Sequence, residues 1–251
     1  MRKLVTAAFV SLDGVMQAPG TPQEDPTGGF TLGGWTVNYW DEPMGGFMDR
    51  IFTDPFALLL GRKTYEIFAA HWPFVGKDDP IGRAFNSATK YVATTSAEPL
   101  TWENSVALRG DAAAEIARLK QEDGPDLLTQ GSSGLLQTLL VHDLIDELRL
   151  LTFPLILGPG KRLFGKGTKP AALKLTASSV STTGVIMSVY ERAGKVDTGS
   201  FAMAEPSQAS ARAEKARASE RAEVRQAAVW LLISRHRRRR SHRFRQPHRS
   251  F

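Results

Sequence analysis

The stretch LLLGRKTYEIF, residues 58–68, places an apolar run directly before a glycine, two cations and a hydroxyl, and then returns to apolar spacing. The three leucines are typical of a buried strand, and the spacing after the glycine predicts a helix over 62–70. Two interpretations of this corner remain open. It is either a solvated turn with two surface cations, or an anion site in which Arg62, Lys63 and Thr64 stand at the start of a helix.

Composition indicates a globular chain with a basic end. The 251 residues are 42% apolar and 23% charged, as in ordinary globular proteins. The formal charge is +6, yet residues 196–251 hold 13 Lys and Arg against 5 Asp and Glu, whereas residues 1–195 hold 19 against 21. We therefore predict one slightly acidic α/β domain over 1–195, followed by a basic Ala/Arg-rich tail over 196–251 that is disordered or weakly helical.

The tail leaves its role open. Residues 235–251 include eight Arg and three His. Blocks of this kind are usually solvated and only sometimes bind nucleic acid, because charge alone attracts without defining a binding surface. The tail is either an extension without a selected role or a nucleic-acid-binding arm.

Missing residue types exclude several function classes. The chain has no cysteine, which excludes disulfides, thiolate metal sites and cysteine nucleophiles. Before the tail it has only His71 and His142, so neither a catalytic triad nor a histidine metal centre is supported, and we predict no metal. The first apolar run is expected to be a strand rather than a secretion signal, and no run approaches the roughly 20 residues of a membrane span. We expect a cytoplasmic protein.

Apolar segments alternate with helical patterns along most of the chain, which is typical of an α/β domain. Strands are expected at 3–11, 56–60, 89–94, 105–108, 126–130, 145–153, 172–181 and 184–192. Helices are expected at 41–53, 62–70, 111–122 and 132–141. The last two strands meet around Thr183 and Gly184 as an antiparallel hairpin, so we predict a mixed, mostly parallel sheet flanked by helices.

A long segment, residues 17–40, interrupts this pattern. Its apolar residues follow neither the alternation of a strand nor the spacing of a helix. It contains three prolines and five glycines and ends in Trp35, Tyr39 and Trp40. Loops of this length are usually functional or disordered. The rings either form a lid or pocket wall, where they could stack on a flat substrate, or simply pack the loop down.

Two further polar corners follow predicted strands. Thr94, Thr95 and Ser96 come after the strand KYVAT, and the sequence GSSG at 131–134 lies between DLLTQ and the helix LLQTLL. Because ligands of open α/β sheets bind at the carboxyl ends of strands, three such corners on one sheet favour a nucleotide site over three unrelated turns.

These pieces resemble a known family. LLLGRKTYE resembles the strand-to-helix corner of dihydrofolate reductase. SLDGVM, GGWTVNYWDE, TQGSSGLLQTLL, DELRLLTFPLILGPGKRLF and GVIMSVYE resemble its bacterial relatives that share a fold with the reductase domain of riboflavin biosynthesis. The resemblance covers roughly residues 2–192. It implies a dihydrofolate reductase-like fold, a homodimer, and an NADPH-dependent reductase of a small heteroaromatic or carbonyl compound, similar to the riboflavin-pathway reductase of a phosphoribosylaminopyrimidine.

The same resemblance implies a role for each corner. Gly61, Arg62, Lys63 and Thr64 would hold NADPH, with the two cations at its 2′-phosphate and Thr64 at its pyrophosphate. Thr94, Thr95 and Ser96 would meet the adenosine side, and Gly131, Ser132, Ser133, Gly134 and Leu135 the pyrophosphate. Paired cations suit a dianionic phosphate, which favours NADPH over NADH.

The acid that would serve catalysis is less well defined. Asp13, after the first strand, is the leading candidate, although Asp13-Gly14 also reads as a turn pair, and Asp41 and Glu42 follow. Dihydrofolate reductases carry an acid in the helix before this corner, but an ungapped count back from the corner reaches Gly45 here, which argues against folate. The alternative function is a nucleotide-binding or nucleic-acid-binding protein without turnover, acting through the basic tail.

Overall fold

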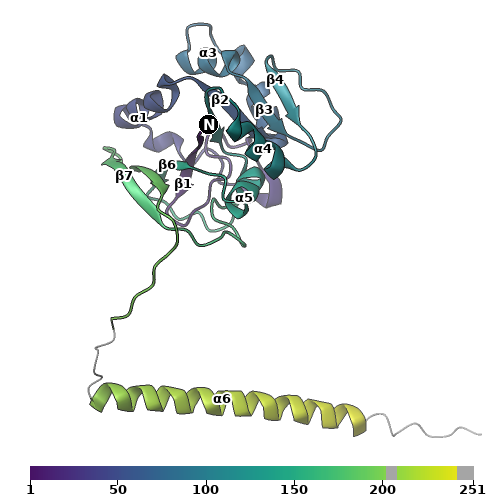
Figure 1. Ribbon diagram of the computed structural model, residues 1–251, viewed down its shortest axis with the longest axis vertical. Coiled ribbons are helices and arrows are strands. Elements are labelled where there is room, and N and C mark those ends of the chain that lie inside the picture. Colours follow the sequence, from purple (N-terminus) through teal and green to yellow (C-terminus); the bar gives the residue numbers. More distant parts are fainter. Residues whose placement is uncertain (202–207, 242–251) are drawn as a thin grey trace, which may run out of the picture. The chain divides into compact units, whose positions relative to one another are not determined.

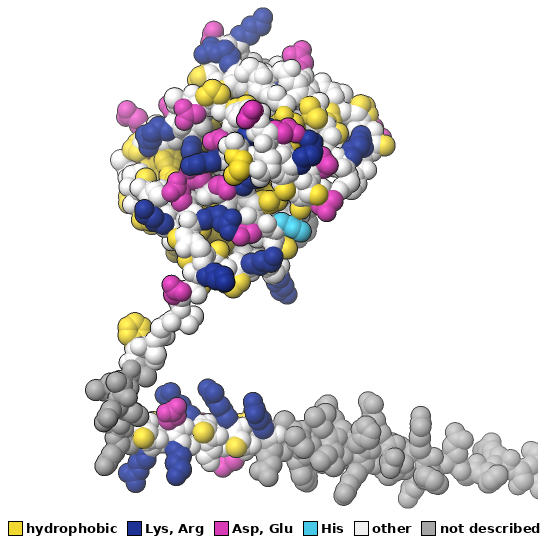
Figure 2. Space-filling view, in the orientation of Figure 1, with side chains coloured by type: hydrophobic (Ala, Val, Ile, Leu, Met, Phe, Trp, Pro, Cys, Tyr) yellow, Lys and Arg dark blue, Asp and Glu magenta, His cyan; other side chains and the backbone are white. Residues whose placement is uncertain are grey.

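A computed structural model of the protein describes residues 1–201 and 208–241. Its contacts divide the chain into two units, Met1–Asp197 and Thr198–Phe251, and each is described by itself (Figure 1). On the visible face of the first unit, cationic and acidic side chains are interspersed rather than gathered in one patch (Figure 2).

The first unit is built on one eight-stranded sheet. Its strands are β1 (Leu4–Ser11), β2 (Phe56–Gly61), β3 (Lys90–Ala93), β4 (Ser105–Leu108), β5 (Asp126–Gln130), β6 (Glu147–Phe153), β7 (Leu173–Val180) and β8 (Ile186–Arg192). They stand in the order β4-β3-β2-β5-β1-β6-β8-β7, with β4 and β7 at opposite sides of the unit (Figure 1). Neighbours from β4 to β6 pair in parallel, and β8 pairs antiparallel with β6 and β7. The predicted mixed, mostly parallel sheet with a C-terminal antiparallel hairpin is confirmed.

Helices cover both faces of this sheet. They are α1 (Glu42–Thr53), α2 (Arg62–Ala69), α3 (Pro80–Ser87), α4 (Ala112–Gln121) and α5 (Ser133–Val141), with short 3-10 turns η1 (Thr27–Gly29), η2 (Val37–Tyr39) and η3 (Trp72–Phe74). Because side chains alternate along a strand, Leu58 and Leu60 enter the core under α1 and α3, whereas Ala57 and Leu59 enter the core under α4 and α5. All predicted strands and helices are present, and α3 was not predicted.

The described residues of the second unit include a long helix, α6 (Gln208–Ser241). Its described side chains, residues 209–225, are all exposed. The side chains of the basic block at 235–251 lie outside the described residues, so its role stays a prediction. Within the described ranges, no helix combines the length and the apolar character that crossing a bilayer requires.

The aromatic end of the 17–40 segment packs onto the sheet. The rings of Trp35 and Tyr39 meet the edge of Phe153, with centroids 5.1 Å and 5.8 Å away. The Trp35 indole N–H also donates to the Gln17 carbonyl oxygen at 2.8 Å. Trp40 packs edge-on against Phe9 with half of its surface exposed. These contacts pack the loop onto the sheet, as in the interpretation that the rings hold the loop down rather than form a lid or pocket wall.

Lys90, at the start of β3, is a buried cation in an aromatic setting. Its Nζ donates to the Asn86 carbonyl oxygen at 2.7 Å and lies 4.3 Å from the centre of the Trp102 ring. Burial lowers the pKa of Lys90 to about 8, and the negative charge of Glu103 opposes this only in part.

This buried lysine predicts a rise in stability with pH. A lysine with a lowered native pKa binds fewer protons in the folded state, so the free energy of unfolding should increase between about pH 8 and pH 10.5. We expect Lys90→Met to remove this rise. Between the two pH values, the increase in the free energy of unfolding measured with urea should be larger in the wild type than in Lys90→Met by about 1 kcal/mol or more. The exposed Lys77→Met should behave like the wild type, and identical pH profiles for wild type and Lys90→Met would contradict the assignment.

Candidate functional site

A cavity of about 810 Å³ lies along the carboxyl ends of β2, β3 and β5, three strands that are neighbours in the sheet. The three polar corners of the sequence meet there because parallel strands end at the same edge. All twelve residues predicted to hold a cofactor line the cavity: Gly61, Arg62, Lys63, Thr64, Thr94, Thr95, Ser96, Gly131, Ser132, Ser133, Gly134 and Leu135. Their role toward a cofactor stays a prediction.

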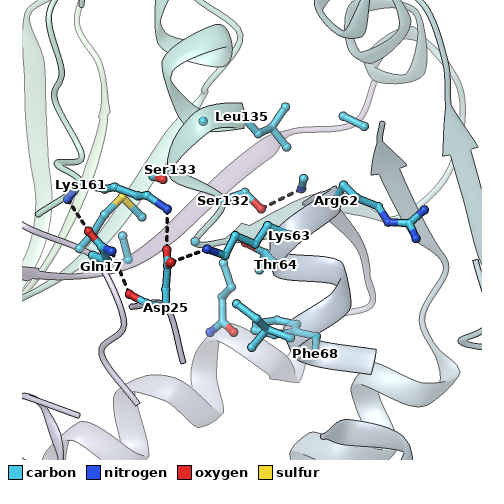
Figure 3. A pocket seen from close by; sticks show the side chains of 18 of the residues that line it. Gln17, Asp25, Arg62, Lys63, Thr64, Phe68, Ser132, Ser133, Leu135 and Lys161 are labelled. Carbon is cyan, nitrogen blue, oxygen red and sulfur yellow. Dashed lines mark hydrogen bonds and ion pairs between the residues drawn. The ribbon is translucent and has the colours of Figure 1, made fainter. Parts of the chain in front are cut away.

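The corners at 61–64 and 131–134 are joined by one hydrogen bond. The Gly61 N–H donates to the Ser132 hydroxyl oxygen at 2.8 Å, which links the start of α2 to the start of α5 (Figure 3). A Cβ at position 61 would lie 3.3 Å from that hydroxyl, so glycine allows the close approach. Gly131 has φ +80°, and Ser132 follows in the left-handed region at φ 62°. This backbone turns the strand sharply into α5.

The helix starts at the cavity differ from the other helix starts of the same unit. At the starts of α1, α3 and α4, the side chains of Asp41, Asp79 and Asp111 each accept a hydrogen bond from a backbone N–H of the first turn. Neither α2 nor α5 has a side-chain cap among the described residues. Uncapped N–H groups and the positive end of the helix dipole favour a bound anion. The cavity therefore has two adjacent positions for negatively charged groups.

The corner at 94–96 offers hydroxyl donors. The Thr94 oxygen accepts from the Ser96 N–H at 3.0 Å, and the Ser96 oxygen accepts from the Glu98 N–H at 3.2 Å. A hydroxyl that accepts in this way keeps its own proton for another partner. Thr95 is exposed between them.

Arg62 and Lys63 leave α2 in different directions (Figure 3). The Arg62 guanidinium donates to the Glu66 carboxylate at 2.6 Å and to the Glu98 carbonyl oxygen at 2.9 Å, on the side of the 94–96 corner. Lys63 reaches the opposite way and binds the Asp25 carboxylate. Successive residues of a helix are about 100° apart, so sequence neighbours do not share a target. Arg62 and Lys63 therefore do not lie side by side, as two cations at one phosphate would, and their roles toward a phosphate stay predictions.

Asp25 joins two lysines at the cavity wall (Figure 3). One carboxylate oxygen accepts from Lys161 Nζ at 2.5 Å, and the other accepts from Lys63 Nζ and, at 2.5 Å, from the Thr27 hydroxyl. Burial raises the pKa of Asp25, but the hydrogen bonds from Lys161, Lys63 and Thr27 outweigh burial and hold it well below its usual value. Gln17 Nε2 supports this arrangement by donating to the Asp25 carbonyl oxygen at 2.9 Å.

Asp13, the leading predicted catalytic acid, does not line the cavity. Its carboxylate accepts from the Ser11 hydroxyl at 2.6 Å and from the backbone N–H groups of Leu157 and Gly158 at 3.1 Å and 2.9 Å. The bond from Ser11, followed by those backbone bonds, holds the pKa of Asp13 well below its usual value. An acid held ionised in this way fixes a loop and is a poor proton donor.

The other predicted catalytic and pocket residues also lie outside the cavity lining. Asp41 caps α1 and accepts from the Thr182 N–H and hydroxyl, both at 2.8 Å. Glu42 is exposed at the first turn of α1. Trp35, Tyr39 and Trp40 pack the loop onto the sheet, as described above. The five residues are therefore not part of this cavity wall, and a role for them toward a ligand stays a prediction.

Sequence reasoning missed the carboxyl groups that do line the cavity, Glu24 and Asp25. Burial raises the pKa of Glu24, although the N–H groups of Gly20 and Thr21 oppose the rise by hydrogen bonding. The apolar lining was missed as well and includes Phe9, Met16, Met48, Ile67, Phe68, Trp72 and Leu151. The acids sit in an aperiodic loop, where nothing local marks which side chain turns inward.

The donors of the cavity fit a dinucleotide with several phosphate groups. Two uncapped helix starts suit a pyrophosphate, and Arg62 beside the hydroxyls of the 94–96 corner suits a further phosphate. The remaining wall is largely apolar and suits flat rings. The volume of about 810 Å³ lies in the usual range of ligand sites.

The chain matches the family described as the RibD C-terminal domain over residues 2–187. Two proteins of Bacillus subtilis (strain 168), both named as uncharacterized, are similar to it. YyaP is 25% identical over 198 residues, covering 75% of this chain and 94% of YyaP. YwjB is 31% identical over 174 residues, covering 69% of this chain and 89% of YwjB.

The fold is also similar to that of solved structures. One of them is a protein of Shewanella sp. PV-4 that is assigned by name to riboflavin biosynthesis, with 22% sequence identity and a TM-score of 0.52. The similarity covers 76% of this chain and 99% of the Shewanella chain.

Proposed function

Since this chain belongs to the family of the RibD C-terminal domain, we propose that it is an oxidoreductase whose cavity binds NADPH beside a small heteroaromatic or carbonyl acceptor. The observation that carries this proposal is the contrast between capped and uncapped helices. Asp side chains cap α1, α3 and α4, whereas α2 and α5 leave their N–H groups to the cavity. Such starts suit the pyrophosphate of a dinucleotide.

NADPH, when bound, would supply a hydride. The chain's own residues bind the cofactor, orient it toward the acceptor and exclude water from the site. The backbone N–H groups at the starts of α2 and α5 bind the pyrophosphate, and Arg62 binds the 2′-phosphate. The apolar wall, which includes Phe68 and Trp72, holds the acceptor and keeps water from the transfer.

Arg62→Ala tests this assignment. We expect the affinity for NADPH to fall roughly 10- to 100-fold, because charge-assisted hydrogen bonds to the 2′-phosphate are lost. The affinity for NADH, which lacks that phosphate, should change less than about threefold. Fluorescence titration of both cofactors measures this.

Arg118→Ala is a matched control, since Arg118 lies on α4 and its ion-pair partners are Glu115 and Glu122. It should bind both cofactors like the wild type. An equal loss of NADPH and NADH in Arg62→Ala would overturn the role of Arg62, and a wild-type protein that binds neither cofactor would overturn the proposed function.

A further inference from the structure

The two ends of the cavity carry different kinds of ion pair. Arg62 pairs with Glu66, four residues along the same helix, whose side chain is 56% exposed. Such a pair is weak and screened, so a ligand phosphate can replace Glu66. At the other end Lys63 and Lys161 both pair with Asp25, whose side chain is only 11% exposed.

Asp25 is fixed where it stands. Its two carboxylate oxygens accept from two ammonium groups and from the Thr27 hydroxyl and N–H, and its carbonyl oxygen accepts from the Gln17 amide. Rotating this carboxylate away would leave a buried charge without partners, which is costly. A ligand anion therefore cannot displace Asp25 as it can displace Glu66.

The charges around Asp25 also disfavour a second anion at this end of the cavity. Lys63, Lys161 and Asp25 together carry a formal charge of +1, and Glu24, next in sequence and also on the cavity wall, reduces it to zero when ionised. A phosphate dianion here would lie next to a fixed carboxylate that already accepts a hydrogen bond from each lysine. The apolar side chains nearby, such as Met16, offer it no donor.

We propose that Asp25 makes this end of the cavity reject phosphate groups, so that an acceptor lying at this end carries no phosphate ester. Asp25 is thus a specificity-determining residue, and Lys63 and Lys161 are held as its counter-ions rather than as phosphate ligands. The statement about the acceptor rests on the proposed function, whereas the rejection of phosphate does not. It also sets this chain apart from a reductase of a phosphorylated pyrimidine.

The experiment uses inorganic phosphate as the probe and the full chain in an Arg62→Ala background, which removes the Arg62 position and leaves the starts of α2 and α5 the same in every variant. Isothermal titration calorimetry compares R62A, R62A/D25N and R62A/D25N/K161M. We expect R62A/D25N to bind phosphate at least tenfold more tightly than R62A, because two ammonium groups lose their counter-ion. The triple variant should lose that gain. Equal phosphate affinity in R62A and R62A/D25N would overturn the proposal.

A second comparison decides the matter if circular dichroism shows R62A/D25N to be unfolded. R62A and R62A/K161M should bind phosphate equally weakly, and phosphate binding by R62A that disappears with K161M would overturn the proposal. Titration of the wild type with NADPH tests the proposed function separately, since its failure would leave the phosphate results standing. An acceptor screen tests the rejection of phosphate directly. Faster NADPH oxidation with a phosphorylated heterocycle than with the same compound lacking its phosphate would overturn the role of Asp25.

Discussion

The Gly134→Asp protein is expected to lose NADPH affinity roughly 100-fold or more while melting at a slightly higher temperature. Gly134 is the second residue of α5 and lines the cavity, and a Cβ there would meet nothing within 4 Å. A carboxylate at this position would repel the phosphates placed at the helix start, and like charges in contact cost several kcal/mol.

The same carboxylate should stabilise the free protein. It would complement the uncapped N–H groups of α5 and replace a helical glycine, which together contribute about 0.5–1.5 kcal/mol. The melting temperature should therefore rise by about 1–5 °C. Cofactor titration and thermal unfolding of the same sample measure both effects.

Gly134→Asn is the matched control, because it has nearly the same size without the charge. It should bind NADPH within about threefold of the wild type. If the asparagine protein lost as much affinity as the aspartate protein, crowding rather than charge would be the cause, and the anion site at α5 would lose its support.

Phe85→Ala is expected to reduce the free energy of unfolding by about 3–5 kcal/mol. Phe85, on α3, is completely buried. Its ring contacts Phe52, Phe56, Phe68 and Trp72 at centroid distances of 5.2, 5.9, 5.7 and 4.8 Å. Removing it leaves a cavity that four rings cannot fill by small movements.

Urea unfolding measures this loss. The slope of the free energy of unfolding against urea concentration should be unchanged if the native fold is kept. Phe74→Ala is the control, since Phe74 lies in η3 and is 81% exposed. It should change stability by less than about 0.5 kcal/mol. Similar effects of the two substitutions would contradict the assignment of Phe85 as the centre of this aromatic cluster.

The sheet could be predicted because its strands carry local signals. Every parallel strand reads as a short apolar run, and the break at Thr183-Gly184 marks the antiparallel hairpin. The helix α3 was overlooked although Asp79-Pro80 is a regular helix start, with Asp79 as the cap. The prolines and glycines that surround α3 obscured its short apolar spacing.

The site was predictable only where it follows strands. Corners at strand ends share one edge, so Gly61, Thr94 and Gly131 could be placed together from the sequence. The pairing of Asp25 with Lys63 and Lys161 joins residues 38 and 136 positions apart, which no local pattern encodes. For the same reason the sequence could not show that the Asp13 carboxylate accepts from the amides of a loop 144 and 145 positions away.

The hydrogen bond between Gly61 and Ser132 ties the cavity to the order of folding. Its partners are 71 residues apart, and β5 must add to β2 before they can meet. A chain emerging from the ribosome therefore completes α2 long before α5 is made. Until α5 is in place, no anion can be held between the starts of the two helices. Any anion that binds across both starts will recognise only molecules in which β2 and β5 have paired, and by mass action will stabilise those molecules against unfolding.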